Sequence, residues 1–149
     1  FAYRYGDKND ISRGASPGNR FEPGKKPMST MAPTIIFDKN NELFLITGSP
    51  GGSDIPAAIL RVITGVIDFD LDIGEATMLP RIHKDWPYVG LEHERAVSRD
   101  IVRRLKSMGH ETEYENTIGS TQSIHIINGV NHGYADLRRP NASVSVQSN

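Results

Sequence analysis

The 149-residue sequence contains no cysteine. This excludes a disulfide framework, a zinc–thiolate site and a cysteine nucleophile within the chain. Long apolar runs are also missing, since no stretch approaches the roughly 18–20 residues that a membrane-spanning helix requires. Lysine and arginine number 17 against 18 acidic residues, so the positive excess typical of nucleic-acid-binding proteins is absent. We expect no membrane segment in this chain and no nucleic-acid partner.

The length suits one ordinary domain with a sizeable core. Residues 1–33 are rich in turn-forming residues and show no helical or strand periodicity, so we expect an extended loop there. A loop of this length is unusual in a lone domain and indicates a missing partner surface. Residues 34–139 carry the periodic segments of the core, and residues 140–149 form a polar tail. Because the sequence begins at Phe1 without methionine, we expect a processed or truncated chain.

Two short apolar runs, at residues 34–37 and 43–47, flank the turn-forming residues 38–41 and predict a β-hairpin. Both runs are apolar at nearly every position. Continuous apolarity is typical of strands buried on both faces, as in the inner layers of a sandwich.

Three helices are predicted from apolar residues at 3–4-residue spacing and from capping residues. Ser53 is the expected cap of the first helix, which carries Ile55–Ile67. Asp72 begins the second helix, where Glu75 completes a capping box. The third helix is expected to begin after the cap Ser98 and to end at Gly109.

Further strands are predicted around these helices, and Asn128-Gly129 predicts a tight turn between the last two of them. A loop with the only tryptophan, Trp86, separates the first two. The overall order, β-β-α-α-β-β-α-β-β-β, favours an α+β fold with antiparallel strands. The predicted ranges are 81–83, 89–92, 111–115, 122–127 and 130–135.

The most informative segment is Thr47–Ser53, which reads Thr-Gly-Ser-Pro-Gly-Gly-Ser. It matches neither a P-loop, a nucleophile elbow nor a dinucleotide fingerprint, and no cofactor is expected. A Gly-Gly turn that opens a helix exposes unhindered backbone N–H groups, which can stabilise a developing negative charge. Gly51 and Gly52 are therefore candidates for an oxyanion hole. The alternative is a tight strand-to-helix turn with no catalytic role.

Ser29 and Thr30 precede the same hairpin, and their hydroxyls can donate hydrogen bonds to a substrate carboxylate. The alternative is a strand-entry segment whose hydroxyls bond to their own backbone. The pairing with the glycine turn favours the functional interpretation, because a closed hairpin brings both segments to one place.

The five histidines show neither His-x-x-x-His nor His-Glu-x-x-His spacing, so no metal site is expected. His125 is interpreted as a sheet residue with satisfied hydrogen bonds rather than as a catalytic base. Asp136, Arg138 and Arg139 are expected to form a structural or solvated ion-pair cluster.

From about residue 19 to about residue 138, the sequence resembles the C-terminal part of the small subunit of γ-glutamyltranspeptidases. Four motifs carry this resemblance in the family's order and at compatible spacing. They are Pro23–Thr34, Thr47–Ser53, Glu75–Arg81 and Gly119–Ile124.

The resemblance implies an N-terminal-nucleophile (Ntn) hydrolase fold, a four-layer αββα sandwich of which this chain supplies one part. It implies a proenzyme that cuts itself and frees an N-terminal threonine, whose own α-amino group can act as the base. That threonine attacks γ-glutamyl amides such as glutathione, and the acyl group passes to water or to an amino acid or peptide. The implied partners are the rest of the proenzyme and a γ-glutamyl small molecule, and the implied location is periplasmic or secreted.

Within the resemblance, Ser29 and Thr30 match residues that bind the substrate α-carboxylate, and Gly51 and Gly52 match the paired oxyanion-hole glycines. The nucleophilic threonine, the acid that binds the substrate amino group and an arginine all fall outside this chain when the alignment is ungapped. A shortened loop would instead place Asp10 in the acidic role.

Residues 5–16 correspond to the family's lid over the glutamyl pocket, without its aromatic residue at the matching place. Two alternatives remain open. One is a related acylase for β-lactam side chains or poly-γ-glutamate, and the other is a catalytically silent homologue or assembly module.

Overall fold

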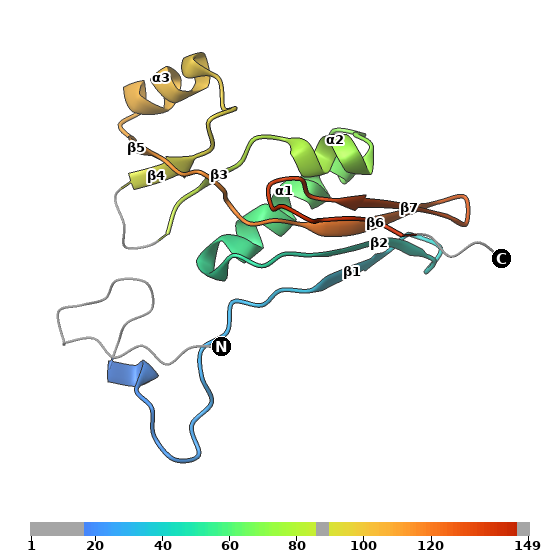
Figure 1. The fold of residues 1–149 in the computed structure, drawn as a ribbon, viewed down its shortest axis with the longest axis horizontal. Helices are drawn as coiled ribbons and strands as arrows, with labels where there is room; N and C mark the ends of the chain where they lie inside the picture. The colour runs from blue at the N-terminus through green and yellow to red at the C-terminus, as the bar shows by residue number, and fades with distance from the viewer. Residues whose placement is uncertain (1–16, 86–89, 146–149) are drawn as a thin grey trace.

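The computed structural model describes residues 17–85 and 90–145. Helices and strands follow the predicted order, with two short 3₁₀ turns added (Figure 1). Their bounds are η2 Pro17–Asn19, β1 Thr34–Phe37, β2 Leu43–Gly48, η3 Gly52–Asp54, α1 Ile55–Ile67, α2 Ile73–Met78, β3 Ile82–His83, β4 Gly90–His93, α3 Arg99–Ser107, β5 Glu111–Tyr114, β6 Gln122–Ile127 and β7 Val130–Ala135.

The larger sheet has four antiparallel strands in the order β1-β2-β6-β7. Its first pair is the predicted hairpin, in which Thr34 lies opposite Thr47. The loops that precede β1 and follow β2 therefore leave the sheet at the same end (Figure 1). The connection that carries Ser29 and Thr30 and the connection that carries Gly51 and Gly52 therefore join the hairpin at the same end.

The core lies between this sheet and the helices α1 and α2, which cover one of its faces (Figure 1). Burying one large aliphatic side chain contributes about 1.5–3 kcal/mol, so this layer supplies much of the fold's stability. Its central buried residues are Leu45, Val62, Val66, Ile73 and Ala76.

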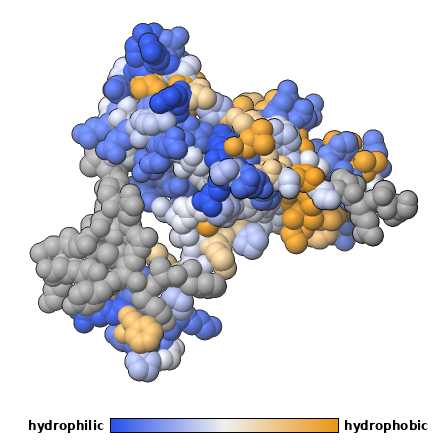
Figure 2. All heavy atoms as spheres, in the orientation of Figure 1, coloured by the Kyte–Doolittle hydropathy of each residue, from blue (hydrophilic) through white to orange (hydrophobic). Residues whose placement is uncertain are grey.

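The other face of the sheet is not covered by any helix or strand of residues 17–85 and 90–145. Ile35 pairs with Ile46, and Ile46 pairs with Ile124, so three isoleucines stand in register across three strands. Ile35 is 60% exposed and Phe37 is 55% exposed. Figure 2 shows apolar side chains gathered over the strands, whereas the surface around α3 is mostly polar. The hairpin was predicted to be buried on both faces, and the described part of the chain covers one of them.

The smaller sheet has the order β3-β4-β5. The pair β3–β4 is antiparallel, but β4 and β5 are parallel, with α3 as the crossover between them. The prediction of antiparallel strands throughout was therefore wrong for this pair. A parallel pair needs a long crossover connection, and α3 provides it.

Local capping signals were mostly correct. Asp72 and Glu75 form the predicted capping box, and the hydroxyl of Ser98 accepts a hydrogen bond from the backbone N–H of Ile101. Ser53, in contrast, is not the cap of α1. The 3₁₀ turn η3 includes Ser53 and moves the start of α1 one residue further along the chain. Asp54 therefore occupies the cap position, and it makes no side-chain capping bond.

Residues 20–33 contain no helix and no multi-residue strand. The predicted loop around Trp86, the lid residues 5–16 and Asp10 lie outside the described residues. Among those that are described, no helix has both the length and the apolar character to cross a membrane.

Candidate active site

The glycine pair lies in the connection between β2 and α1, at the sheet end described above. Gly51 has φ 143° and Gly52 has φ 64°, both in the region that favours glycine. No acceptor in residues 17–85 or 90–145 takes the backbone N–H of either glycine, although Asp54 N–H donates to the carbonyl of Gly51. An oxyanion hole requires backbone N–H groups that are not already bonded to the protein, and the described residues agree with this requirement.

The two glycines differ in how much room surrounds them. A side-chain carbon added at Gly51 would lie 3.1 Å from the Cα of Gly119, whereas at Gly52 it would meet nothing within 4 Å. Gly51 is thus packed against a neighbouring segment, and Gly52 faces open space. Both positions are glycine, so this difference could not be predicted from the sequence.

Ser29 and Thr30 lie in the loop that leads into β1. Ser29 is exposed, and its hydroxyl accepts a hydrogen bond of 3.2 Å from the backbone N–H of Met31. Thr30 is half-buried. The Ser29 hydroxyl keeps its own proton for donation, so the local turn and carboxylate binding are compatible. The bond from Met31 to Ser29 is the local bond expected of a strand-entry segment. It leaves the Ser29 hydroxyl proton free for the carboxylate that the functional interpretation requires.

Gly51 and Gly52 line a cavity of about 270 Å³ whose other walls are strongly acidic. Asp54, Asp85 and Glu92 contribute carboxylates to this cavity, and so does Glu115. Burial raises the pKa of Glu92, and the negative charge of Asp54 raises it further. This wall attracts cations, including ammonium groups, to the side of the glycine turn.

Three of the groups around this cavity could hold a metal ion. One ligand atom each from Asp54, His83 and Glu92 lies within 4.8 Å of the other two. His83 also contacts Asp85, with 2.9 Å between Nε2 and Oδ1. These residues come from the 3₁₀ turn η3 and the strands β3 and β4, so the histidine spacing from which no metal site was expected could not reveal them.

A buried ion network lies behind the glycine turn. The Arg81 guanidinium is fully buried and contacts Asp136 at 2.8 Å, and it also donates to the carbonyl of Ile118 and to the Thr121 hydroxyl. Arg138 joins this network through Glu94, at 2.7 Å, and through Asp136. Such a network is strongly destabilised when one partner is removed.

The predicted cluster at Asp136 is therefore real but has different members. Arg138 belongs to it as expected, Arg139 is exposed, and Arg81 and Glu94 are the partners that sequence proximity could not show. Burial opposes ionisation of Asp136. The backbone N–H of Arg138 and the charge of Arg81 nevertheless lower its pKa overall.

His125 is a sheet residue as interpreted, but it is not hydrogen-bonded as expected. Neither ring nitrogen has a partner among the described residues, and the ring packs edge-on against Phe44, with centroids 4.6 Å apart. Burial lowers its pKa, with a further contribution from His132. A neutral imidazole suits this apolar position.

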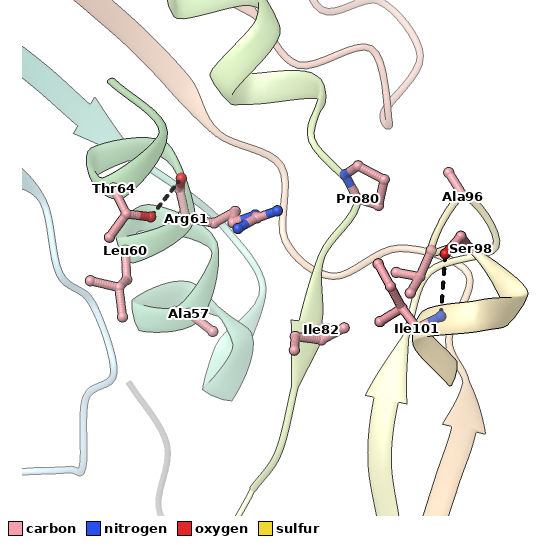
Figure 3. Close-up of a pocket in the computed structure, with 10 residues that line it drawn as sticks. Ala57, Leu60, Arg61, Thr64, Pro80, Ile82, Ala96, Ser98 and Ile101 are labelled. Atoms are coloured by element: carbon pink, nitrogen blue, oxygen red, sulfur yellow. Dashed lines mark hydrogen bonds between the residues drawn. The ribbon is translucent and has the colours of Figure 1, made fainter. Parts of the chain in front are cut away.

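A larger cavity, of about 500 Å³, lies between α1, the segment at Pro80–Ile82 and the start of α3 (Figure 3). Its walls are mainly apolar, with Leu60 on one side and Ile101 on the other (Figure 3). Among the described residues that line it, Arg61 is the only charged one. The cavity at the glycines carries four carboxylates instead, so it is the better candidate for chemistry.

Comparison with known proteins identifies the family of the chain. Residues 2–146 match the family model described as γ-glutamyltranspeptidase. The "glutathione hydrolase proenzyme" of Escherichia coli K12 is 35% identical over 139 residues, which make up 93% of this chain and 24% of that protein. The chain thus spans about a quarter of the length of the curated relatives it matches.

Two solved structures extend the comparison to three dimensions. A γ-glutamyltranspeptidase mutant of Helicobacter pylori superposes with a TM-score of 0.82 at 34% identity, covering 92% of this chain and 77% of that one. A cephalosporin acylase from Bacillus halodurans gives 0.79 at 25% identity, covering 88% and 25%. The α+β architecture with one helix-covered sheet is part of the Ntn-hydrolase fold. By its sequence motifs, fold and family match, the chain belongs to the γ-glutamyltranspeptidase family.

Proposed function

We propose that this chain forms the C-terminal part of an amidase and acyltransferase that cleaves γ-glutamyl amides such as glutathione. The observation that carries the proposal is the glycine turn, where Gly51 and Gly52 present two backbone N–H groups without acceptors among the described residues. Family membership supports the same reaction class. The curated relatives bear the name glutathione hydrolase proenzyme.

In the proposed reaction, the hydroxyl oxygen of an N-terminal threonine outside this chain attacks the γ-carbonyl carbon of the substrate. Its proton passes to the threonine's own amino group, and the carbonyl oxygen becomes an oxyanion that accepts hydrogen bonds from Gly51 and Gly52. The C–N bond then breaks, and the departing amine takes up the proton. Water or a second amine attacks the acyl-enzyme through a similar oxyanion, releasing glutamate or a new γ-glutamyl amide.

Ser29 and Thr30 are proposed to hold the α-carboxylate of the γ-glutamyl group. They lie at the same end of the hairpin as the glycine turn because β1 and β2 are antiparallel. The remainder of the precursor is proposed to supply the nucleophile, the acid that binds the amino group and an arginine. It is also proposed to cover the bare face of the four-stranded sheet.

The test is turnover of a γ-glutamyl anilide by the complete precursor that contains these residues, with and without a dipeptide acceptor. Anilide release and a γ-glutamyl dipeptide product would support the proposal. Absence of both, in protein shown by mass to be cleaved in two, would contradict it.

A second candidate is an acylase for β-lactam side chains, which the match to a cephalosporin acylase favours. Cephalosporin bearing a carboxylate-ended acyl chain, assayed on the same preparation, separates the two. Faster turnover of that cephalosporin than of the anilide would select the acylase.

A further inference from the structure

The segment Ile118–Thr121 lies directly against the glycine turn, far away in sequence. The hydroxyl of Ser49 accepts a hydrogen bond of 2.9 Å from the backbone N–H of Ser120 and donates one of 2.7 Å to the carbonyl of Pro50. Ser49 therefore links this segment to the residue immediately before Gly51.

The glycine turn and the segment Ile118–Thr121 are closely packed against each other. A side-chain carbon at Gly119 would lie 2.8 Å from the Ser49 hydroxyl and 2.7 Å from the Cβ of Ala58, and one at Gly51 would lie 3.1 Å from Gly119 itself. None of these three distances could hold a side-chain carbon unless neighbouring atoms shifted. The two segments are therefore packed too closely at Gly51 and Gly119 to admit a side chain between them.

The segment at Ile118–Thr121 is itself fixed from behind. Ile118 and Thr121 are fully buried, and their backbone N–H groups donate to Glu94 and to Asp136. Arg81 adds bonds to the Ile118 carbonyl, at 2.9 Å, and to the Thr121 hydroxyl, at 3.1 Å. Ser49 is thus anchored to a part of the molecule that a buried ion network immobilises.

We propose that Ser49 is a positioning residue for acyl transfer: by tying the glycine turn to Ser120, it fixes the direction of the Gly51 and Gly52 N–H groups toward the oxyanion. This proposal rests on the proposed function of the two glycines. Ser49 itself donates to Pro50 rather than to substrate, so its effect is indirect. Its contribution arises in the transition state, because only there does the oxyanion exist.

The test is Ser49→Ala in the complete precursor, with kcat, KM and the number of active sites measured on one preparation. We expect kcat per titrated site to fall roughly 10- to 100-fold, because small misplacements of catalytic groups have effects of this size. KM should stay within about twofold, since substrate binding by Ser29 and Thr30 is left intact. Both acylation and deacylation pass through an oxyanion, so the fall should appear whichever step limits turnover.

Ser107→Ala is the matched control. The Ser107 hydroxyl also donates to a backbone carbonyl, that of Arg104 at 2.8 Å, but it lies at the end of α3. Its kcat should equal that of the unmodified enzyme. Ser49→Cys keeps a hydrogen-bonding side chain at this position, but its sulfur is larger than the serine oxygen and is a weaker acceptor, so the kcat of this variant should fall between those of the serine and alanine forms. If the Ser49→Ala protein cannot be obtained in folded form, the kcat of Ser49→Cys is compared with that of the unmodified enzyme instead.

The positioning role would be overturned if Ser49→Ala had a lower melting temperature or fewer active sites but an unchanged kcat per site. Equal kcat for serine, cysteine and alanine would do the same. The proposed function fails separately, if the unmodified precursor does not release anilide. If the unmodified precursor cleaves itself but does not turn over the anilide, the proposed reaction is contradicted. If the unmodified precursor and Ser49→Ala are equally active, only the positioning role of Ser49 is contradicted.

Discussion

The two segments proposed to meet the substrate are held in very different ways. The glycine turn contacts residues about 70 positions away, through the 2.9 Å bond from Ser120 to Ser49 and the close approach of Gly119. The hydroxyl of Ser29, in contrast, bonds only two residues along the chain, to Met31. Groups that stabilise a transition state must be preorganised, whereas a ground-state grip tolerates a looser loop.

The glycine turn and the loop at Ser29 differ in how far their supports extend along the chain. The glycine turn and its supports all lie within the described residues, so its geometry is decided here. The loop at Ser29 and Thr30 precedes β1, and the hydrogen bond printed for Ser29 within the described residues is local, from the backbone N–H of Met31. Changes behind the turn should therefore have the largest effects, and changes in the loop smaller ones.

The most damaging change should be Arg81→Met, which removes the centre of the buried network. Breaking a buried ion pair by deleting one partner costs about 3–5 kcal/mol of unfolding free energy, because Asp136 is left buried with less compensation. Urea unfolding of the complete protein measures the loss. Arg139→Met is the control, since Arg139 is exposed and such substitutions usually stay within about 0.5 kcal/mol. Equal losses would contradict the network as drawn.

Gly51→Ala should come next and should act mainly on kcat. Its φ of 143° and the 3.1 Å approach to Gly119 force the turn to move when a side chain is added. Loss of one oxyanion donor lowers the rate about 10²- to 10³-fold, with little change in KM. Gly52→Ala meets no atom within 4 Å, so the strain of a positive φ remains its main disturbance and its effect should be smaller.

The same preparation should yield kcat, active-site number and melting temperature. A destabilised Gly51→Ala variant that turns over normally at each titrated site would reduce the turn to a structural element. An effect of Gly52→Ala larger than that of Gly51→Ala would show that the open space, rather than the packed side, governs the reaction.

Ser29→Ala tests the loosely held segment. Losing a hydrogen bond to a charged carboxylate typically costs about 1.5–3 kcal/mol, and we expect it as a rise in KM with kcat at saturation largely kept. Thr34→Ala provides a matched comparison, because the Thr34 hydroxyl donates only to the nearby carbonyl of Ala32. If both variants keep the parental KM for a γ-glutamyl anilide, Ser29 is only a turn residue.

The smallest expected effect is a pH-dependent one at Glu92. Burial and Asp54 raise the pKa of Glu92 in the folded state, so its ionised form disfavours folding. That penalty is absent below the ordinary glutamate pKa and fully present above the raised one. Glu92→Gln should therefore raise the melting temperature at pH 7, and the gain should vanish as the pH falls toward 4.

Glu94→Gln should show the opposite sign. Burial opposes ionisation of Glu94, but hydrogen bonds from Arg138 and from the backbone N–H groups of Ile118 and Arg81 lower its pKa overall. Its ionised form stabilises the fold at neutral pH, and this contribution is lost as the pH falls through its lowered pKa. The variant should melt lower at pH 7, with the difference shrinking in acid. The same sign for both variants would contradict the opposite environments assigned to Glu92, in the acidic cavity, and Glu94, in the buried ion network.

The sequence by itself determined what short-range chemistry controls. The hairpin, the capping box at Asp72, the cap at Ser98 and the turn at Asn128-Gly129 were all predictable, because each depends on residues within a few positions of one another. The motifs were also sufficient to identify the family. Ser53 failed as a cap because a single 3₁₀ turn, too small to leave a periodic signal, displaced the start of α1.

Only the tertiary structure decided how distant segments meet. The parallel pairing of β4 and β5, the partners of Arg81 and the acidic wall beside Gly52 all join residues from separate elements. No local pattern encodes which buried cation will find which carboxylate. The difference between Gly51 and Gly52 has the same origin. The two residues are identical in sequence, and they differ only because Gly119 packs against Gly51 and not against Gly52.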